Sequence, residues 1–327
     1  MQEEMKELTI SLSPHVHSGR TLDRCMWNVV IALIPTFAVA VWTFGAPALW
    51  VVLTSVAACL ATEYAIERWL FHRPCTLTNG SALITGLLLG FNLPSILPLW
   101  MVIIGGVVAV GIGKMSFGGL GQNIWNPALV GRVFLLLSFP AAMTTWPAVQ
   151  SGMDAATGAT VQADASTGAT LLAQLNAGHD SMDGAHLMDM LVGHMNGSLG
   201  EVGSIAILLG LVYLLCTRTI TWHIPVSVLA SAAFFSWAFG GNPLLDLLAG
   251  GLLLGAVFMA TDYVTSPMTH AGQILFGICI GAITMVIRRF GSYPEGVSFA
   301  ILLMNSFVPL INRYMHPHVL GERRKKK

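Results

Sequence analysis

Long apolar stretches alternate with shorter polar ones along most of the chain. A helix that crosses a bilayer needs about 20 largely apolar residues, and several stretches come close to that length. The segment at 80–94 is shorter and ends at Pro94, so we expect a tilted or partial helix there. The pattern predicts helices near 26–45, 47–67, 80–94, 96–113, 127–145, 199–216, 222–239, 244–260, 272–287 and 296–312.

These segments form two sets of five, one on each side of a polar interval at 146–198. Gly86-Leu-Leu-Leu-Gly90 in the third segment recurs as Gly251-Leu-Leu-Leu-Gly255 in the eighth, and Phe-Gly precedes the fifth and the tenth. Because five is odd, equivalent helices would run in opposite directions. Chance recurrence is the alternative, since Gly and Leu are common in such helices. The expected fold class is an all-α integral membrane protein with about ten transmembrane helices in two inverted five-helix repeats.

Lysine and arginine residues set the expected orientation, because positively charged loops favour the cytoplasm. They recur near alternate helix ends, whereas Val133 to Thr217 contains neither residue type. Arg288 and Arg289 do not fit: either they are buried or paired, or the ninth helix is assigned wrongly. The expected parts are a cytoplasmic N-terminal segment (1–25), the first five-helix repeat (26–145), an extracytoplasmic loop (146–198), the second five-helix repeat (199–312) and a basic cytoplasmic tail (313–327).

Composition supports the membrane assignment. The chain of 327 residues is 54% hydrophobic and 10% charged, with a mean hydropathy of +0.70, which lies outside the range of soluble domains. The net charge is zero, so nothing indicates nucleic-acid binding. No cleavable signal is expected, because the first residues are polar and mixed in charge. The scattered cysteines and histidines indicate no metal site.

The polar interval holds a duplicated heptapeptide, Asp154-Ala-Ala-Thr-Gly-Ala-Thr160 and Asp164-Ala-Ser-Thr-Gly-Ala-Thr170. A threonine hydroxyl can form a phosphoester, and the small neighbours leave it accessible to a modifying enzyme. The aspartate of each copy supplies a carboxylate for recognition. The alternative is a low-complexity loop of Ala, Gly and Thr with an accidental duplication.

A second candidate region is the glycine-rich turn from Gly118 to Pro127. Non-helical backbone in a membrane must be buried in protein or line a wet cavity, so a re-entrant turn near a cofactor or ion is one interpretation. An ordinary tight cytoplasmic loop is the other. Charges within or beside apolar segments hint at function because they are costly there. Among them Arg132 and Asp262 are expected within reach of the same side as this turn, and Glu63 lies in the second segment.

Several motifs together resemble one family, that of the D subunit of the Rnf ion-translocating oxidoreductase complex and the B subunit of the sodium-translocating NADH:quinone reductase (the RnfD/NqrB family). The resemblance covers nearly the whole chain. The residues that carry it are Ser13 to His17, Gly118 to Arg132, Met259 to Pro267 and Tyr293 to Asn305. The short N-terminal extension favours the Rnf branch.

The resemblance implies FMN attached through its phosphate to the last threonine of the heptapeptide on the outer side, transferred from FAD by a separate flavin transferase. Both Thr160 and Thr170 fit, and Thr170 is favoured because an apolar pair, Leu171 and Leu172, follows it. Those leucines could also hold the flavin against the membrane surface. The other residues of the expected attachment motif are Asp164, Thr167, Gly168 and Ala169.

The resemblance also implies a second, non-covalent flavin (riboflavin) within the membrane part, for which the 118–127 turn is the candidate region. It further implies other subunits of the Rnf complex as partners, beside membrane lipid, in a bacterial or archaeal cell membrane. The expected role is electron relay from reduced ferredoxin towards NAD, coupled to sodium or proton translocation, with no complete active site in this chain alone. The alternative is a solute permease or channel with a urea-transporter-like inverted repeat.

Overall fold

The structure is a computed structural model of the 327-residue chain. It describes residues 21–72, 76–146, 191, 193, 197–201, 203–291 and 296–315. Within these residues every regular element is helical and no strand occurs. We call residues 21–146 the first half and residues 203–315 the second half.

Two helices of the first half begin with a capping side chain. The Thr21 side chain accepts a hydrogen bond from the Arg24 N–H at the start of α1, and the Asn126 side chain does the same for Ala128 at the start of α5. The helices are α1 (Leu22–Phe44), α2 (Ala46–Ala65) with a π-helical turn η1 (Ile66–Leu70), α3 (Ser81–Phe91), α4 (Leu99–Gly111), α5 (Pro127–Ser138) and α6 (Pro140–Met143).

The second half begins with α9, and here too side chains cap helix starts. Asn242 caps α11 ahead of Pro243, and Thr269 caps α13. The helices are α9 (Ser204–Cys216), α10 (His223–Ala238), α11 (Pro243–Leu248), α12 (Leu252–Leu254) with a π-helical turn η4 (Gly255–Met259), α13 (His270–Phe290) and α14 (Val297–Tyr314).

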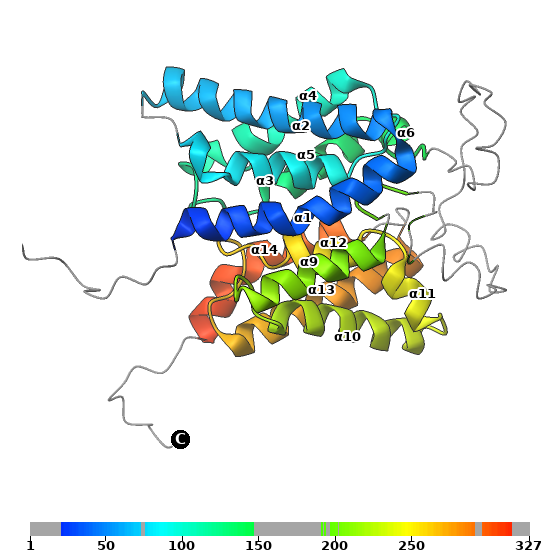
Figure 1. Ribbon diagram of the computed structural model, residues 1–327. Coiled ribbons are helices and arrows are strands. Elements are labelled where there is room, and N and C mark those ends of the chain that lie inside the picture. Colours follow the sequence, from blue (N-terminus) through cyan, green and yellow to red (C-terminus); the bar gives the residue numbers. More distant parts are fainter. Residues whose placement is uncertain are drawn as a thin grey trace, which may run out of the picture.

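The helices lie roughly side by side, so that the bundle has two ends (Figure 1). The start of α1 and the end of α14 lie at one end, which we call the terminal end. The α1–α2 connection and α6 lie at the opposite end, which we call the loop end. The halves meet where α1 packs on α9 and α5 packs on α14.

Among the described residues, five helical stretches are long and apolar enough to cross a membrane, and four more apolar helices are shorter. The chain is therefore an all-helical membrane protein. The expectation of ten spans stays a prediction, because the shorter helices do not reach a full span on their own. The five long stretches are Leu22–Phe44, Ala46–Leu70, Leu99–Phe117, His270–Phe290 and Val297–Tyr314.

Two segments that the apolar pattern predicted as continuous helices are interrupted. The segment at 127–145 breaks at Phe139, where Pro140 starts the short α6. The segment at 244–260 breaks between α11 and α12, where Ala249 has extended backbone and Gly250 a φ of +67°. Hydropathy alone misses such breaks because the interrupting residues are themselves apolar or small.

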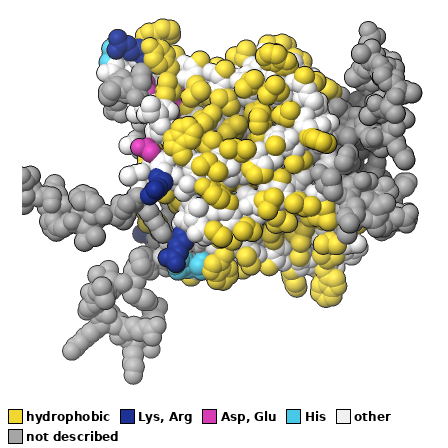
Figure 2. Space-filling model, viewed as in Figure 1, with side chains coloured by type: hydrophobic (Ala, Val, Ile, Leu, Met, Phe, Trp, Pro, Cys, Tyr) yellow, Lys and Arg dark blue, Asp and Glu magenta, His cyan; other side chains and the backbone are white. Residues whose placement is uncertain are grey.

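The outer surface of the bundle is largely apolar. The face in Figure 2 carries a broad band of hydrophobic side chains, and its charged side chains gather at the terminal end. This distribution is typical of a surface that contacts lipid. The tryptophans expected to flank the apolar segments are exposed, as interfacial anchors would be; they are Trp42, Trp50, Trp69, Trp100 and Trp237.

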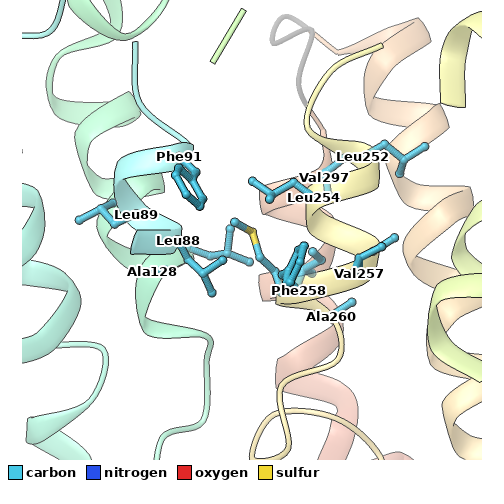
Figure 3. Close-up of a cluster of buried hydrophobic side chains, with 14 of the residues drawn as sticks. Leu88, Leu89, Phe91, Ala128, Leu252, Leu254, Val257, Phe258, Ala260 and Val297 are labelled. Atoms are coloured by element: carbon cyan, nitrogen blue, oxygen red, sulfur yellow. The ribbon is translucent and has the colours of Figure 1, made fainter. Parts of the chain in front are cut away.

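The core includes an apolar cluster between the two halves (Figure 3). Leu89 and Phe91 of α3 are fully buried, and so is Ala128 of α5. Buried side chains of α12 and η4, with Val297 of α14, face them across the interface. Small residues allow close approach elsewhere: a Cβ on Gly86 would lie 2.6 Å from the Val56 Cα, so α2 and α3 touch at the backbone.

Candidate functional site

The duplicated heptapeptide lies outside the described residues, and so do all the residues expected to attach FMN. They are Thr160, Asp164, Thr167, Gly168, Ala169 and Thr170. The described chain stops at Trp146 and continues again from Gly197 to Glu201, after single described residues at 191 and 193. Leu199 donates to the Leu93 carbonyl and Gly200 to the Phe91 carbonyl, so this returning segment is fixed to the end of α3.

A cavity between the halves is the best-formed candidate site among the described residues. It contains about 750 Å³ of free space, its open mouth included. Its wall is mostly apolar, with polar groups at the rim. The apolar wall comprises Met26, Val29, Ile84, Leu88, Leu214 and Phe258, and the polar rim includes Ser81, Thr85, Lys114, Asn123, Asn126 and Asp262.

The glycine-rich turn from 118 to 127 lines this cavity. Gly118, Gly119 and Gly121 have φ values of +114°, +104° and +89°, which residues with a Cβ rarely adopt. This backbone brings Leu120 and Asn123 to the cavity wall. The turn therefore lines a cavity, and the presence of a cofactor or ion beside it stays a prediction.

Asp262 is held at the rim by the turn and by its own loop. Its carboxylate accepts hydrogen bonds from the Val264 N–H and the Thr265 hydroxyl, and it also interacts with the Asn123 amide. Burial raises the pKa of Asp262 above its ordinary value, and these hydrogen bonds oppose the rise. Asp262 and the turn therefore belong to one site, as the sequence suggested.

Arg132 does not join them, and the expectation that it lies on the same side was wrong. Its guanidinium donates to the Asn92 side chain at 2.6 Å and to the Ser298 hydroxyl at 3.0 Å. Asn92 in turn donates to the Met259 sulfur at 3.7 Å. Arg132 is not among the residues that line the cavity, because it lies more than one helical turn beyond Pro127, the α5 residue that does.

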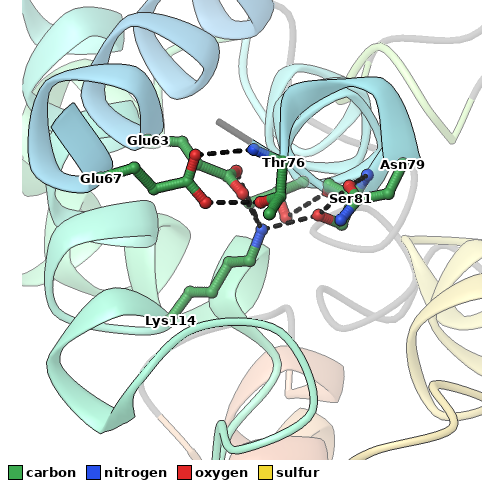
Figure 4. Close-up of polar contacts among 7 residues, drawn as sticks. Glu63, Glu67, Thr76, Asn79, Ser81 and Lys114 are labelled. Atoms are coloured by element: carbon green, nitrogen blue, oxygen red, sulfur yellow. Dashed lines mark hydrogen bonds and ion pairs between the residues drawn. The ribbon is translucent and has the colours of Figure 1, made fainter. Parts of the chain in front are cut away.

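Lys114 is the site residue that the sequence did not reveal. The charge pattern predicted a cytoplasmic residue, yet only 2% of its side chain is exposed. Its ammonium group donates to both Glu63 oxygens at 2.8 Å and to the Ser81 hydroxyl at 2.7 Å (Figure 4). The available signal was a lysine directly after the fourth predicted segment and two glutamates, Glu63 and Glu67, at the end of the second.

Glu67, one helical turn after Glu63, is also buried. It accepts hydrogen bonds from the backbone N–H and the hydroxyl of Thr76, as Figure 4 shows. These hydrogen bonds attach the α2–α3 connection to η1, next to the ion pair of Lys114 and Glu63. The π-helical turn η1 carries Glu67, and such turns often occur at functional sites.

Of the arginine pair that did not fit the charge pattern, Arg288 is buried and Arg289 is exposed but paired, so the first of the two alternatives holds. Arg288 is 3% exposed and donates to the carbonyls of Asp246 and Ala249 at 2.6 and 2.9 Å. Arg289 lies 4.0 Å from the Asp246 carboxylate, which also accepts from the Ser236 hydroxyl. The ninth predicted helix is present as α13, so its assignment stands.

Comparison with known proteins identifies relatives over the whole length of the chain. The chain is 45% identical over 324 residues to the D subunit of the proton-translocating ferredoxin:NAD(+) oxidoreductase complex of Clostridium ljungdahlii, with 97% of each chain covered. It is 42% identical over 322 residues to the D subunit of the Na(+)-translocating ferredoxin:NAD(+) oxidoreductase complex of Acetobacterium woodii, covering 98% of this chain and 97% of that one. It is 40% identical over 328 residues to the D subunit of the ion-translocating oxidoreductase complex of Stutzerimonas stutzeri, with 92% of each covered.

The family described as "NQR2, RnfD, RnfE family" matches residues 9–321. This range includes all ten predicted apolar segments, the polar interval and every buried charge described above. The resemblance expected from the sequence motifs is thereby confirmed. The chain belongs to the NQR2, RnfD and RnfE family.

Proposed function

We propose that this chain is the membrane subunit of an ion-translocating oxidoreductase of the ferredoxin:NAD type and that it relays electrons through covalently bound FMN. The observation that carries the proposal is the sequence similarity, over nearly the full length of the chain, to relatives named as D subunits of such complexes. The other subunits are its partners. Its share of the activity is electron transfer coupled to sodium or proton movement, with no complete active site of its own.

FMN attachment is proposed at Thr170, through a phosphoester to the hydroxyl, with Asp164, Thr167, Gly168 and Ala169 as the recognition sequence. Thr160 is the alternative. The support is the second copy of the heptapeptide and the leucine pair that follows it. When bound, the flavin supplies one-electron and two-electron chemistry.

The attachment is tested on denatured protein. We expect the full chain, produced together with a flavin transferase, to keep yellow-green fluorescence in a denaturing gel and to gain the mass of FMN less water. Thr170→Val should remove both signals and Thr160→Val, the matched control, should keep them. The reverse pattern would move the site to Thr160, and no fluorescence in any version would overturn the carrier proposal.

A second, non-covalent flavin is proposed in the cavity between the halves. The residues fit such a group: the apolar wall suits a flat ring system, and the Thr85 and Thr261 hydroxyl oxygens at the rim can accept hydrogen bonds. Asn123 and Asp262 hold the polar rim in place. The flavin would be retained by native protein and released on denaturation, unlike the covalent one.

The ten-span inverted repeat is also proposed, and the helix packing supports it. In the first half α4 packs between α2 and α5, and in the second half α13 packs between α10 and α14. Short helical elements occupy equivalent places, α3 against α2 and α5, and α11 with η4 against α10 and α14. In such an arrangement the N- and C-termini lie on one side of the membrane and the flavin-bearing loop on the other.

A further inference from the structure

A second cavity lies where α1 begins, at the terminal end of the bundle, and we call it the terminal cavity. It contains about 1060 Å³ of free space, its open mouth included. It adjoins the cavity between the halves, because Ile220, Thr261 and Tyr263 line both. Most of its polar lining residues carry hydroxyl groups; these are Thr21, Thr219, Thr221, Thr261, Tyr263 and Ser266.

Hydrogen bonds between loops hold the wall of the terminal cavity in place. The Thr221 hydroxyl donates to the Gln273 side-chain oxygen at 3.0 Å, and the Gln273 amide donates to the Pro267 carbonyl at 3.2 Å. The Tyr263 hydroxyl donates to the Thr219 carbonyl. The α9–α10 loop is therefore attached both to the loop after η4 and to α13, so the cavity is formed before any ligand binds.

Arg218 carries the only charge among the described residues that line the terminal cavity. Its side chain is exposed, and no described residue accepts a hydrogen bond from it or from the Ser266 hydroxyl. Asp262 lies between two lining residues, but its carboxylate accepts from Val264 and Thr265 and lines the other cavity. The described wall therefore offers hydrogen-bond donors and positive charge without an acidic side chain.

The backbone at Arg218 indicates that the arginine is not there to suit the turn. α9 ends in a Schellman motif, in which the Thr219 N–H donates to the Leu214 carbonyl at 2.9 Å and the Arg218 N–H to the Leu215 carbonyl at 3.0 Å. Arg218 has the left-handed backbone that this motif requires, with a φ of +52°, where glycine is usual and a Cβ is strained. Such strain is common where a side chain serves a function. The alternative explanation is the attraction of a cation to the end of a helix.

The surroundings of the terminal cavity are typical of the level of lipid headgroups. The charged side chains of the bundle gather at this end, beyond the apolar band (Figure 2). Trp222, next to the lining residue Thr221, is 55% exposed, and Tyr263 is 48% exposed. Amphipathic aromatic residues of this kind mark the interface between lipid and water. A phosphate at the membrane surface therefore lies within reach of the cavity.

Arginine and hydroxyl donors together suit a phosphate, whose oxygens accept several hydrogen bonds at once. Basic pockets between membrane helices bind lipid headgroups in this way. We propose that the terminal cavity binds a phosphoryl group, held by the Arg218 guanidinium with the Ser266 hydroxyl as a further donor. The headgroup of an anionic phospholipid and soluble phosphate present this same chemistry.

The test measures alkylation of Cys25, a half-buried residue of the terminal cavity, in the full chain with its other cysteines replaced. In phosphatidylcholine nanodiscs, added phosphatidylglycerol should slow the reaction, because a bound headgroup covers the thiol. Arg218→Gly should raise the fraction of phosphatidylglycerol needed for half protection about fivefold or more, the usual contribution of one arginine at a membrane surface. The unfolding temperature of this variant should stay the same or rise, because glycine relieves the backbone strain.

Two controls separate binding from general surface charge. A version that keeps only Cys216, which is exposed at the end of α9 and is not a lining residue, should be slowed much less than Cys25. Arg68→Met, which removes an exposed arginine elsewhere, should leave the protection of Cys25 intact. Equal protection of Cys25 with and without Arg218, or equal slowing of Cys25 and Cys216, would overturn the proposal.

Inorganic phosphate and riboflavin identify the source of the ligand. Protection by inorganic phosphate in phosphatidylcholine nanodiscs, lost in Arg218→Gly, would assign the site to soluble phosphate. Protection by phosphatidylglycerol alone would assign it to lipid. Protection by riboflavin in both versions, with no effect of either phosphate compound, would assign the terminal cavity to the flavin of the adjoining cavity and contradict the proposal.

Discussion

Lys114 holds a full positive charge where almost none of its side chain meets solvent. Burial of a charge is costly unless hydrogen bonds and an opposite charge compensate it, and here Glu63 and Ser81 accept all three ammonium donors. The lysine also lines the cavity, so its position sets the charge of one wall. The Lys114–Glu63 ion pair therefore stabilises the fold and also forms part of the candidate site.

Removal of one partner of this ion pair should destabilise the protein strongly. We expect Lys114→Met to lower the free energy of unfolding by about 3–5 kcal/mol, because Glu63 would remain buried and unpaired. The double variant Lys114→Met with Glu63→Gln should recover much of the loss. Thermal unfolding in detergent measures both, and Arg68→Met, which removes an exposed charge, should change the value by less than about 0.5 kcal/mol. A fully additive double variant would contradict the pairing.

The sequence identified some of the charged residues that matter and missed others. Intramembrane Glu63 and Arg132 stood out because a charge in an apolar segment is conspicuous. Lys114 did not, because it follows an apolar segment and resembles an ordinary flanking residue. Glu201 was missed although it lies at the start of the predicted segment 199–216, because its burial depends on the pairing of Leu199 and Gly200 with the end of α3.

At the scale of elements, close backbone contact between α2 and α3 explains part of the recurrent Gly-Leu-Leu-Leu-Gly motif. Gly86 lies so close to α2 that a side chain would not fit between the helices. Gly255 lies similarly close to α14, because a Cβ on it would be 2.4 Å from the Val297 Cγ1. The leucines between the glycines fill the core on either side of the interface. Both copies of the motif therefore serve packing.

A methyl group at Gly86 should separate α2 from α3. We expect Gly86→Ala to lower the free energy of unfolding by about 1–3 kcal/mol, because its Cβ would meet the Val56 backbone at 2.6 Å. Gly111→Ala is the matched control, since the nearest atom to its Cβ would be the Ile66 Cδ1 at 3.9 Å. Equal unfolding temperatures for the two variants would show that the helices do not touch at Gly86.

Element positions were largely predictable from the apolar pattern, whereas interruptions were not. The long apolar stretches predicted α1, α2, α4, α13 and α14, because these lie in the longest and most uniformly apolar helical stretches. It could not locate the break between α11 and α12, because the residues there are as apolar as those around them. That break exists because Arg288 from a distant helix satisfies the freed carbonyls.

At the scale of the whole molecule, the proposed arrangement places the loop end outside the cell and the terminal end in the cytoplasm. The support is the absence of lysine and arginine from Val133 to Thr217 and their presence around the terminal end. Ser181 lies in the polar interval, outside the described residues, and Ser116 lies exposed beside the glycine-rich turn. These two positions should therefore face opposite compartments.

Cysteine labelling distinguishes the two orientations. In a version without the native cysteines, Ser181→Cys should react with a membrane-impermeant maleimide in intact cells. Ser116→Cys, the matched control, should react only after the membrane is permeabilised. The opposite pattern would invert the proposed topology, and labelling of both positions in intact cells would show that the cells were leaky.

The contact of Arg288 with α11 also bears on the order in which the chain is inserted during synthesis. The carbonyls of Asp246 and Ala249 are left open by the break, and their donors belong to a residue 42 and 39 positions further along. Until α13 has left the ribosome, the segment from α11 to η4 has no internal partner for those groups in lipid. Its final placement in the bilayer therefore waits for translation of the ninth predicted helix.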